Sequence, residues 1–450
     1  MGAVLCVDVG STFTKALLVG DDGEVRGRAS RPTTVATDVM DGVDAVRAAL
    51  ADGAAPERTL LCSSAGGGLR VAVVGYEREV TAEAGFRVGL SAGGRVVHVA
   101  SGPMVGADVT ALRADRPDLV LLVGGTDGGN ADVLLHNARR LARARVTAPV
   151  VVAGNADAAD AVVAELEATG RRFTVTGNVL PRIGEVAPDG ARAAIREVFL
   201  RHVIGGKGLS RGRGFAELVR AATPDAVLRG VEVLAEARGE DVLVVDVGGA
   251  TTDVYSVVTP QGEDAAIHRE VVGPVWHART VEADLGMRWN AEGIVEASAR
   301  ERMPLPDAVA GHAARVAADT GALSTSDAEW AADEALATAA VTVALRRHGR
   351  PAAGERPRPL ADVGMLVGSG GVLRHAPDGT AERVLGAALA DHGGGWRVPD
   401  RAVAAVDRDY VLFAAGLLAD VDPARASALV GGLSPKRGGP LSAGGPTVGP

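Results

Sequence analysis

The sequence predicts an α/β fold with two related lobes and a small inserted domain. Residues 4–19, VLCVDVGSTFTKALLV, return 238 positions later as residues 242–257, VLVVDVGGATTDVYSV, with eight identities at the same offsets: Val, Leu, Val, Asp, Val, Gly, Thr and Val. Between the two copies, continuous apolar runs alternate with helical patterns, as in parallel sheets covered on both faces. A chain of 450 residues, 47% hydrophobic but only 3% aromatic, suits several cores of small aliphatic side chains.

The first lobe is expected over residues 1–85. Residues 3–30 read as three strands, of which the last two are joined by an Asp-Gly turn at residues 21–24. Residues 38–53 carry apolar side chains at helical spacing and end in Gly, which predicts a helix. Residues 59–77, TLLCSSAGGGLRVAVVGYE, contain two apolar runs on either side of a Gly cluster, which favours two further strands.

A doubly wound domain is expected as an insertion over residues 86–205. Apolar strands at 118–125, 148–155 and 171–181 are each followed by a helical pattern, the arrangement of parallel strands joined by helices. The Gly-rich, basic stretch IGGKGLSRGRG comes next. A linker with a connecting helix is therefore expected over residues 206–240.

The second lobe is expected over residues 241–400. It opens with the second copy of the hairpin and continues with a helical region at about 290–348, a Pro-rich turn and the strand-loop DVGMLVGSGGVL. Helices at 401–432 are expected to return to the first lobe. Residues 433–450 are rich in Gly and Pro without a core pattern, so disorder is predicted there.

Charge and composition argue against several classes of protein. A formal net charge of −9 argues against nucleic-acid binding, which depends on Lys and Arg that neutralise phosphates. The two cysteines, Cys6 and Cys62, are too few for a disulfide framework or an iron–sulfur site and read as reduced core residues. The first residues lack a signal-peptide pattern, and no apolar run is long enough to span a membrane. The sequence therefore predicts a cytoplasmic protein without a membrane partner.

In both copies of the repeat, a buried strand ends in Asp-Val-Gly and small residues follow. Such a turn exposes backbone N–H groups and hydroxyls with little side-chain bulk, which suits phosphate oxygens. Two turns that face each other would clamp a polyphosphate, with Asp8 and Asp246 holding Mg²⁺ mainly through its waters and Asp253 adding a third carboxylate. One Gly turn alone is more often an ordinary tight turn, but packing gives no reason to repeat Asp, Gly and Thr at identical offsets.

A third Gly-rich loop completes a nucleotide-binding pattern. In MLVGSGGVL an apolar strand leads into a loop where a flat base can approach the backbone, so we predict a site for Mg-ATP. The predicted catalytic carboxylates are Asp8, Asp246 and Asp253, and the first two are also the predicted metal ligands. The predicted nucleotide-binding residues are Gly10, Ser11, Thr12, Lys15, Gly248, Gly249, Thr251, Thr252, Gly368, Ser369, Gly370 and Gly371.

The order DVGSTFTK, DVGGATTD and GSGG resembles the phosphate-1, phosphate-2 and adenosine motifs of the superfamily of acetate and sugar kinases, heat-shock chaperones and actin. The resemblance implies two ribonuclease-H-like domains of the actin-like ATPase type, with ATP in the cleft between them. It also implies that the helix at 223–238 and the stretch VLFAAGLLAD at 411–420 are the two helices that connect the lobes.

Within that superfamily, six stretches resemble the glutamate mutase accessory protein family called MutL, which is unrelated to the mismatch-repair protein of that name. They are DVGSTFTKALLV, VGGTDGGN, GNVLPRIGEV, VDVGGATTDVYSV, RTVEADLGMR and GSGGVL, and together they extend over most of residues 3–420. The resemblance implies a slow ATPase that acts as a reactivating chaperone for an adenosylcobalamin-dependent mutase or aminomutase and drives release of inactive cobalamin.

The partner is expected to carry the cobalamin. The lower-ligand motif Asp-x-His-x-x-Gly requires Asp two residues before His, and none of the nine histidines has one. HVIGGKGLS is not a P-loop, because Gly208 stands where Ser or Thr should follow Lys207. GGTDGGN at 124–130 suits either an anion at a helix N-terminus or a turn with Asn130 as the N-cap.

Two further stretches allow both a structural and a functional interpretation. CSSAGGGLR offers Ser63 and Ser64 as candidate nucleophiles, but no His accompanies them in the motif, so a structural role is expected. RTVEADLGMR, with Glu282 and Asp284, reads either as a charged, solvated helix start or as a segment near the nucleotide that acts in lobe closure.

Two functions remain open. One is ATP-driven reactivation of a cobalamin mutase; the other is a small-molecule kinase of the same superfamily, in which a carboxylate takes a proton from a substrate hydroxyl. The related activators of 2-hydroxyacyl-CoA dehydratases need cysteines for an iron–sulfur cluster, which this chain lacks. The inserted domain has no evident sugar-binding residues and suits protein docking, so reactivation is favoured.

Overall fold

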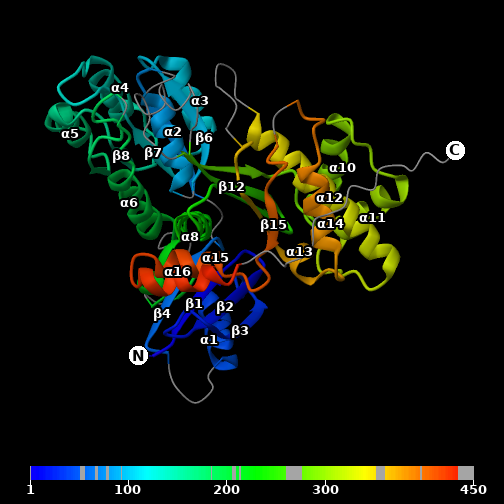
Figure 1. The fold of residues 1–450 in the computed structure, drawn as a ribbon. Coiled ribbons are helices and arrows are strands. Elements are labelled where there is room, and N and C mark those ends of the chain that lie inside the picture. The colour runs from blue at the N-terminus through cyan, green and yellow to red at the C-terminus, as the bar shows by residue number, and fades with distance from the viewer. Residues whose placement is uncertain are drawn as a thin grey trace.

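The predicted α/β fold class, with two related lobes and an inserted parallel domain, is confirmed by the sheets of the molecule (Figure 1). The computed structural model describes residues 2–50, 56–65, 69–77, 81–92, 94–183, 185–204, 209–211, 214–259, 276–350, 360–395 and 398–433, and these form three five-stranded sheets. Outside the described residues lie the ending predicted to be disordered, from residue 434 on, the Pro-rich turn from residue 351 on, Lys207 and Gly208.

The first lobe has the strand order β10-β4-β1-β2-β3. Strands β1, β2 and β3 form an antiparallel meander, and β4 and β10 run parallel to β1. The bounds are β1 (Val4–Val9), β2 (Phe13–Val19), β3 (Val25–Pro32), β4 (Arg58–Ser63), β10 (Val219–Ala222) and α1 (Val39–Ala49). All of β1 is buried, because alternate side chains face α1 on one side and the interlobe helices on the other. Strand β10, expected in the linker, instead completes this sheet.

The second lobe repeats this architecture with the order β13-β12-β11-β14-β15. Strands β11, β12 and β13 form the meander, and β14 and β15 run parallel to β11, so each strand has a counterpart in the first lobe. The bounds are β11 (Val242–Val247), β12 (Thr252–Val258), β13 (Trp276–Glu282), β14 (Met365–Ser369) and β15 (Val403–Val406). The repeat in the sequence therefore marks a repeat of the whole sheet.

Helices cover the second lobe. They are α10 (Ala291–Arg300), α11 (Asp307–Ala318), α12 (Asp327–Gly349), α13 (Gly371–His375) and α14 (Thr380–Leu389). The longest, α12, begins with a capping box in which Ser326 and Glu329 bond to each other's backbone. None of the helices in the described ranges combines the length and apolar character of a membrane span.

The inserted domain has an all-parallel sheet with the order β6-β5-β7-β8-β9. Its strands are β5 (Arg70–Gly75), β6 (Arg95–Ser101), β7 (Leu119–Leu122), β8 (Val150–Val152) and β9 (Phe173–Val175). Its helices, and the short ones that follow, are α2 (Thr81–Ser91), α3 (Gly106–Ala114), α4 (Asp132–Arg143), η1 (Ala156–Ala158), α5 (Ala159–Glu167), α6 (Asp189–Val198), η2 (Phe199–Ile204) and α7 (Gly214–Leu218). Strand β5 lies in this sheet and not, as expected, in the first lobe, because an apolar run identifies a strand but not its neighbours.

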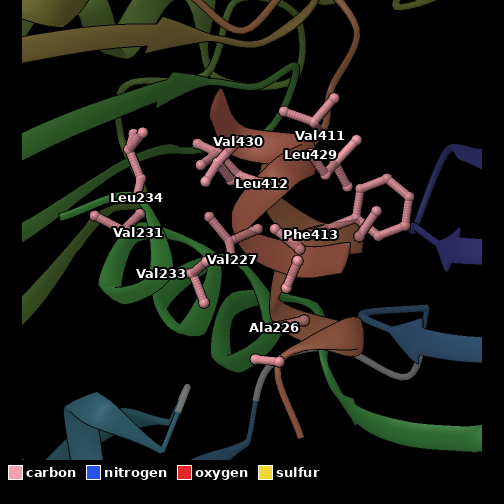
Figure 2. Packing of buried hydrophobic residues seen from close by; sticks show 14 of the residues in the cluster. Ala226, Val227, Val231, Val233, Leu234, Val411, Leu412, Phe413, Leu429 and Val430 are labelled. Carbon is pink, nitrogen blue, oxygen red and sulfur yellow. The ribbon is translucent and has the colours of Figure 1, made fainter. Parts of the chain in front are cut away.

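Two helices cross between the lobes, α8 (Thr223–Arg238) and α15 (Leu412–Leu418), and α16 (Pro423–Gly431) packs beside them (Figure 2). They cross in direct backbone contact at two glycines. A Cβ atom on Gly230 would lie 1.9 Å from the carbonyl oxygen of Leu412, and one on Gly416 would lie 1.8 Å from that of Ala226. The hydrophobic cluster at the crossing includes side chains of β1 and β11, so one core continues from lobe to lobe.

Candidate functional site

The two copies of the hairpin fold into the same turn. Gly10 donates its N–H to the carbonyl oxygen of Phe13 at 3.1 Å, and Gly248 donates to that of Thr251 at 2.9 Å. A Cβ on Gly10 would lie 2.8 Å from the Phe13 oxygen, and one on Gly248 would lie 2.9 Å from the Thr251 oxygen. Glycine is therefore required at both positions, since no side chain fits under the turn.

The tips of both turns present backbone N–H groups. Among the residues that the structure describes, no protein acceptor bonds to the N–H of Ser11, Thr12, Gly249 or Ala250. Ser11, Thr12 and Gly249 are also exposed. Consecutive N–H groups of this kind make a concave site for anionic oxygens.

Asp8 is buried at the end of β1, where three protein groups donate to it. The hydroxyl of Thr223 donates to Oδ1 at 2.6 Å, and the thiol of Cys62 lies 3.6 Å from the same oxygen. The hydroxyl of Tyr410 donates to Oδ2 at 3.2 Å. Three side chains, from β4, α8 and the loop before α15, therefore orient this carboxylate.

Asp246 occupies the equivalent place at the end of β11 and opposes Ser369 on the neighbouring strand β14. Its surroundings raise the pKa of Asp246 through burial, and the charges of Asp253 and Asp8 act in the same direction. Lys15 and a hydrogen bond with Ser369 oppose that rise. Because Asp8 and Lys15 belong to the first lobe, the two hairpins lie within electrostatic reach of each other.

Two predicted site residues of the second hairpin have side chains that already bond to other protein groups. Asp253, predicted as a third catalytic carboxylate, is paired through Oδ1 with Arg279 Nε at 3.0 Å and Nη2 at 2.6 Å, and Oδ2 accepts from the hydroxyl of Thr251 at 3.0 Å. Thr252, predicted to bind nucleotide, is buried and donates its hydroxyl to the carbonyl oxygen of Leu285 at 2.6 Å. Successive strand residues face opposite sides, which turns Thr252 into the lobe.

The glycines of the third loop have different roles. A Cβ on Gly368 would lie 2.8 Å from a methyl carbon of Leu373, so this glycine makes room for helix packing rather than for a base. Gly370 has φ +102° and lies so close to β11 that a Cβ would be 2.1 Å from the Val247 carbonyl oxygen. Gly371 is exposed and faces open space. Of the three, only Gly371 leaves the close approach that a base requires.

The stretch RTVEADLGMR supports the second hairpin turn. The N–H of Met287 donates to the Gly248 oxygen at 3.0 Å, and those of Arg288 and Trp289 donate to the Gly249 oxygen at 2.8 and 2.9 Å. These bonds occupy the carbonyl side of the turn and leave its N–H groups outward. Of the two interpretations of this stretch, the charged helix start is wrong, because Arg279 to Glu282 belong to β13.

The carboxylates of that stretch have a structural partner. Arg347 on α12 lies 2.8 Å from Glu282 and 2.7 Å from Asp284. The hydrogen bond from Arg347 lowers the pKa of Asp284, whereas burial raises the pKa of Glu282. Both carboxylates therefore hold the segment on α12.

Sequence reasoning assigned no individual role to several residues near the hairpins: Thr223, Arg279, Arg374, Asp407 and Tyr410. Asp407 is fully buried and accepts from the backbone N–H of Val411 at 2.8 Å and of Leu412 at 3.2 Å, which caps α15. Burial raises the pKa of Asp407 to about 6. An Asp shortly before the apolar run VLFAAGLL was a helix-start signal that could have identified it.

The other candidate stretches are explained by local structure. In GGTDGGN, Asn130 accepts from the N–H of Asp132 at 2.7 Å, as a turn before α4 requires, and Asp127 accepts from Asn178 and Ala156 at 2.8 Å each. Ser63 is buried and donates to the Val9 carbonyl oxygen at 3.1 Å. Over the described ranges, no three His, Cys, Asp or Glu side chains are grouped to hold a metal ion. Mg²⁺ bound by one or two carboxylates and by phosphates does not need such a group, so Asp8 and Asp246 fit that mode.

Comparison with known proteins identifies relatives along nearly the whole chain. A family model described as MutL protein matches residues 4–432. Protein MutL of Clostridium tetanomorphum is 33% identical over an alignment of 453 positions, and the alignment covers 95% of this chain and 98% of that protein.

Solved structures show weaker similarity. A ROK family glucokinase from Streptomyces griseus in complex with glucose and AMPPNP is 14% identical, with a TM-score of 0.34, and the match covers 95% of this chain and 99% of that one. Xylulose kinase from Rhodospirillum rubrum is 16% identical, with a TM-score of 0.35, and the match covers 95% and 92% of the two chains.

Proposed function

The chain belongs to the MutL protein family, and on that premise we propose that it reactivates an adenosylcobalamin-dependent mutase in an ATP-dependent manner. The partner is glutamate mutase or a related aminomutase of the cytoplasm, and it carries the cobalamin itself. Slow ATP hydrolysis drives release of cobalamin that has lost its adenosyl group. The inserted domain is the part that we propose docks on the mutase.

The doubled hairpin turn is the observation that carries this proposal. Its outward N–H groups at Ser11, Thr12 and Gly249 suit the oxygens of a polyphosphate, and Lys15 adds a positive charge between the lobes. Asp8 and Asp246 would hold Mg²⁺ through its waters, and the metal would neutralise phosphate charge. The nucleoside would bind beside Gly371 in the third loop.

The two hairpin turns lie on different lobes, so a ligand that binds both turns can change how the lobes are arranged. When both turns bind the same polyphosphate, the closed arrangement of the lobes is favoured, and a shorter phosphate chain relaxes it. Only such a difference in affinity between the two arrangements can move a conformational equilibrium.

The partners of the carboxylates support slow hydrolysis over the kinase alternative. A kinase needs a carboxylate that can take a proton from an acceptor hydroxyl. Asp253 is paired with Arg279, Asp407 accepts two backbone N–H groups, and Asp8 accepts two hydroxyls. Each of these three described carboxylates is thus engaged by protein donors.

The decisive experiment uses a cobalamin mutase encoded beside this protein and identified by Asp-x-His-x-x-Gly. The mutase is inactivated with hydroxocobalamin and mixed with the purified protein, free adenosylcobalamin and Mg-ATP. Activity should return only with Mg-ATP. Asp8→Ala and Asp246→Ala should abolish recovery and weaken Mg-ATP binding at least about tenfold, because a charge-assisted contact is worth about 1.5–3 kcal/mol.

Asp44→Ala is the matched control, because Asp44 is an exposed residue of α1 that pairs with Arg47 on the same helix. It should behave as wild type. Equal recovery without nucleotide, or no recovery under any condition, would reject reactivation. Rapid transfer of phosphate from ATP to a sugar or a carboxylic acid would establish the kinase alternative.

A further inference from the structure

Both interlobe helices begin at the same carboxylate. Thr223 is the first residue of α8, and Tyr410 lies two residues before α15. Their hydroxyls donate to the two different oxygens of Asp8, at 2.6 and 3.2 Å. Asp8 is only 2% exposed and stands beside the first hairpin turn. One side chain of the first lobe therefore contacts the start of each helix that joins the lobes.

Tyr410 is held from both lobes. Its ring centre lies 3.9 Å from Nζ of Lys15 on β2, 5.3 Å from the guanidinium carbon of Arg374 on α13, and 5.0 Å from the ring centre of Phe413. Its φ is +58°, a left-handed value that a bulky side chain adopts only when surrounding contacts impose it.

A displacement at the start of α8 has a path to the rest of the molecule. Gly230 and Gly416 place the backbones of α8 and α15 in contact without intervening side chains, so a displacement of one helix is expected to move the other. Further along α8, the buried Glu232 lies 3.1 Å from Arg192 on α6 of the inserted domain and 2.9 Å from His277 on β13 of the second lobe. Helix α8 is thus bonded to all three sheet domains.

We propose that Thr223 and Tyr410 are positioning residues that couple ligand binding at Asp8 to the orientation of α8 and α15. The inference rests on the proposed function, in which Asp8 contacts the water shell of Mg²⁺. Metal-bound waters donate to carboxylate oxygens, as the two hydroxyls do, so both compete for the lone pairs of Asp8. The starts of the helices respond to that competition, and Glu232 conveys the response to the inserted domain.

The test compares hydroxyl deletions that keep side-chain shape. Tyr410→Phe keeps the ring contacts with Lys15 and Arg374, and Thr223→Val keeps the volume, whereas Thr223→Ser restores the hydroxyl. The controls are Tyr76→Phe and Thr110→Val in the inserted domain; the Thr110 hydroxyl donates to the Gly106 carbonyl oxygen of its own helix. Calorimetry gives the Kd for Mg-AMPPNP and for Mg-ADP, and hydrogen exchange follows the first turns of α8 and α15.

Wild type should prefer Mg-AMPPNP and change exchange at both helix starts when it binds. Tyr410→Phe and Thr223→Val should bind both nucleotides, but the ratio of the two Kd values should fall at least about fivefold, the lower end of ordinary coupling between sites. The exchange response should disappear in both variants. Thr223→Ser and the two controls should match wild type.

The inference is overturned if both deletions keep the wild-type ratio and exchange response, while the proposed function then stands. It is equally overturned if the deletions weaken both nucleotides to the same extent, since the hydroxyls would then act in binding and not in coupling. If wild type binds neither nucleotide, the proposed function fails first. Should Tyr410→Phe not fold, the Thr223→Val and Thr223→Ser pair decides.

Discussion

At the scale of single residues, the partners of a carboxylate decide its chemistry. Asp253 and Asp407 illustrate this, because Asp253 is paired with the buried Arg279, whereas Asp407 is enclosed and is held by backbone N–H groups. An aspartate side chain is therefore a member of an ion pair at position 253. At position 407 an aspartate side chain caps a helix, and its pKa is raised to about 6.

Asp407→Asn should change the pH dependence of stability. The folded protein holds this proton up to about pH 6, whereas the unfolded chain releases it near its ordinary pKa of about 4, so wild type loses stability as the pH rises from about 4 to about 6. The variant has no carboxyl group at this position and does not lose this stability. In wild type the full loss in the free energy of unfolding, reached above about pH 6, is about 3 kcal/mol. Its Tm relative to wild type should rise across this interval and stay level above it.

Calorimetry of both proteins between pH 4 and 8 measures the difference. Loss of the longer hydrogen bond, from Leu412, shifts the variant by a constant amount and does not alter the slope. The exposed Asp378→Asn is the control and should show no such trend. A Tm difference that is independent of pH for Asp407→Asn would contradict the raised pKa.

At the scale of elements, the crossing of α8 and α15 depends on backbone contact. Their glycines are helical residues, which ordinarily cost a helix about 0.5–1 kcal/mol relative to Ala. The close approach at Gly230 and Gly416 explains why glycine occupies these helical positions. A Cβ on either residue would overlap a carbonyl oxygen of the other helix. The two glycines thus set the distance between the interlobe helices.

Gly230→Ala and Gly416→Ala should each lower stability by about 1–3 kcal/mol or more, because the helices must separate to admit the methyl group. Gly386→Ala in α14 is the matched control, since a methyl group there would have no described atom of another element within 4 Å. That variant should gain about 0.5–1 kcal/mol from helix propensity. Thermal unfolding of the three proteins compares them; a Gly230→Ala protein as stable as Gly386→Ala would refute the close crossing.

At the scale of the whole molecule, Glu232 connects the parts. Figure 1 shows α8 between the inserted domain and the C-terminal helices α15 and α16, and Glu232 reaches from it to Arg192, Arg229 and His277. Burial alone would raise the pKa of Glu232. The hydrogen bonds from His277 and Arg229 and the charge of Arg192 prevail and lower the pKa to about 2.

Glu232→Gln should destabilise the assembled molecule at neutral pH. Because the folded pKa of about 2 lies below the ordinary value of 4.5, the stabilisation is present above about pH 4.5 and is lost as the pH falls toward 2. Its full size is about 3 kcal/mol. The difference in unfolding free energy between variant and wild type should shrink over that interval.

The exposed Glu296→Gln, which removes a surface pair with Arg300, serves as the control and should change stability by less than about 0.5 kcal/mol. Denaturant titrations at several pH values between 2 and 7 measure both variants. If Glu232→Gln were as stable as wild type at pH 7, the buried ion pairs would not join the domains as described.

Much of the architecture was determined by the sequence alone, because its signals are local. The repeated Asp-Val-Gly hairpins predicted the two lobes and the turns at Gly10 and Gly248, where a tight hydrogen-bonded turn excludes any side chain. The helix predicted at 223–238 has those bounds as α8, and the alternation of apolar strands and helices predicted the parallel inserted sheet. Turn chemistry and hydrophobic period act within a few residues, so they can be read without coordinates.

Only the tertiary structure decided which neighbours these elements have. Strand β5 could join either sheet until the packing was known, and Arg279 on strand β13 is buried because it pairs with Asp253 on the neighbouring strand. The two hydroxyls that donate to Asp8 belong to Thr223 and Tyr410, which lie 215 and 402 positions further along the chain. Contacts over such separations depend on how whole lobes and helices pack against one another, and no local pattern in the sequence records that.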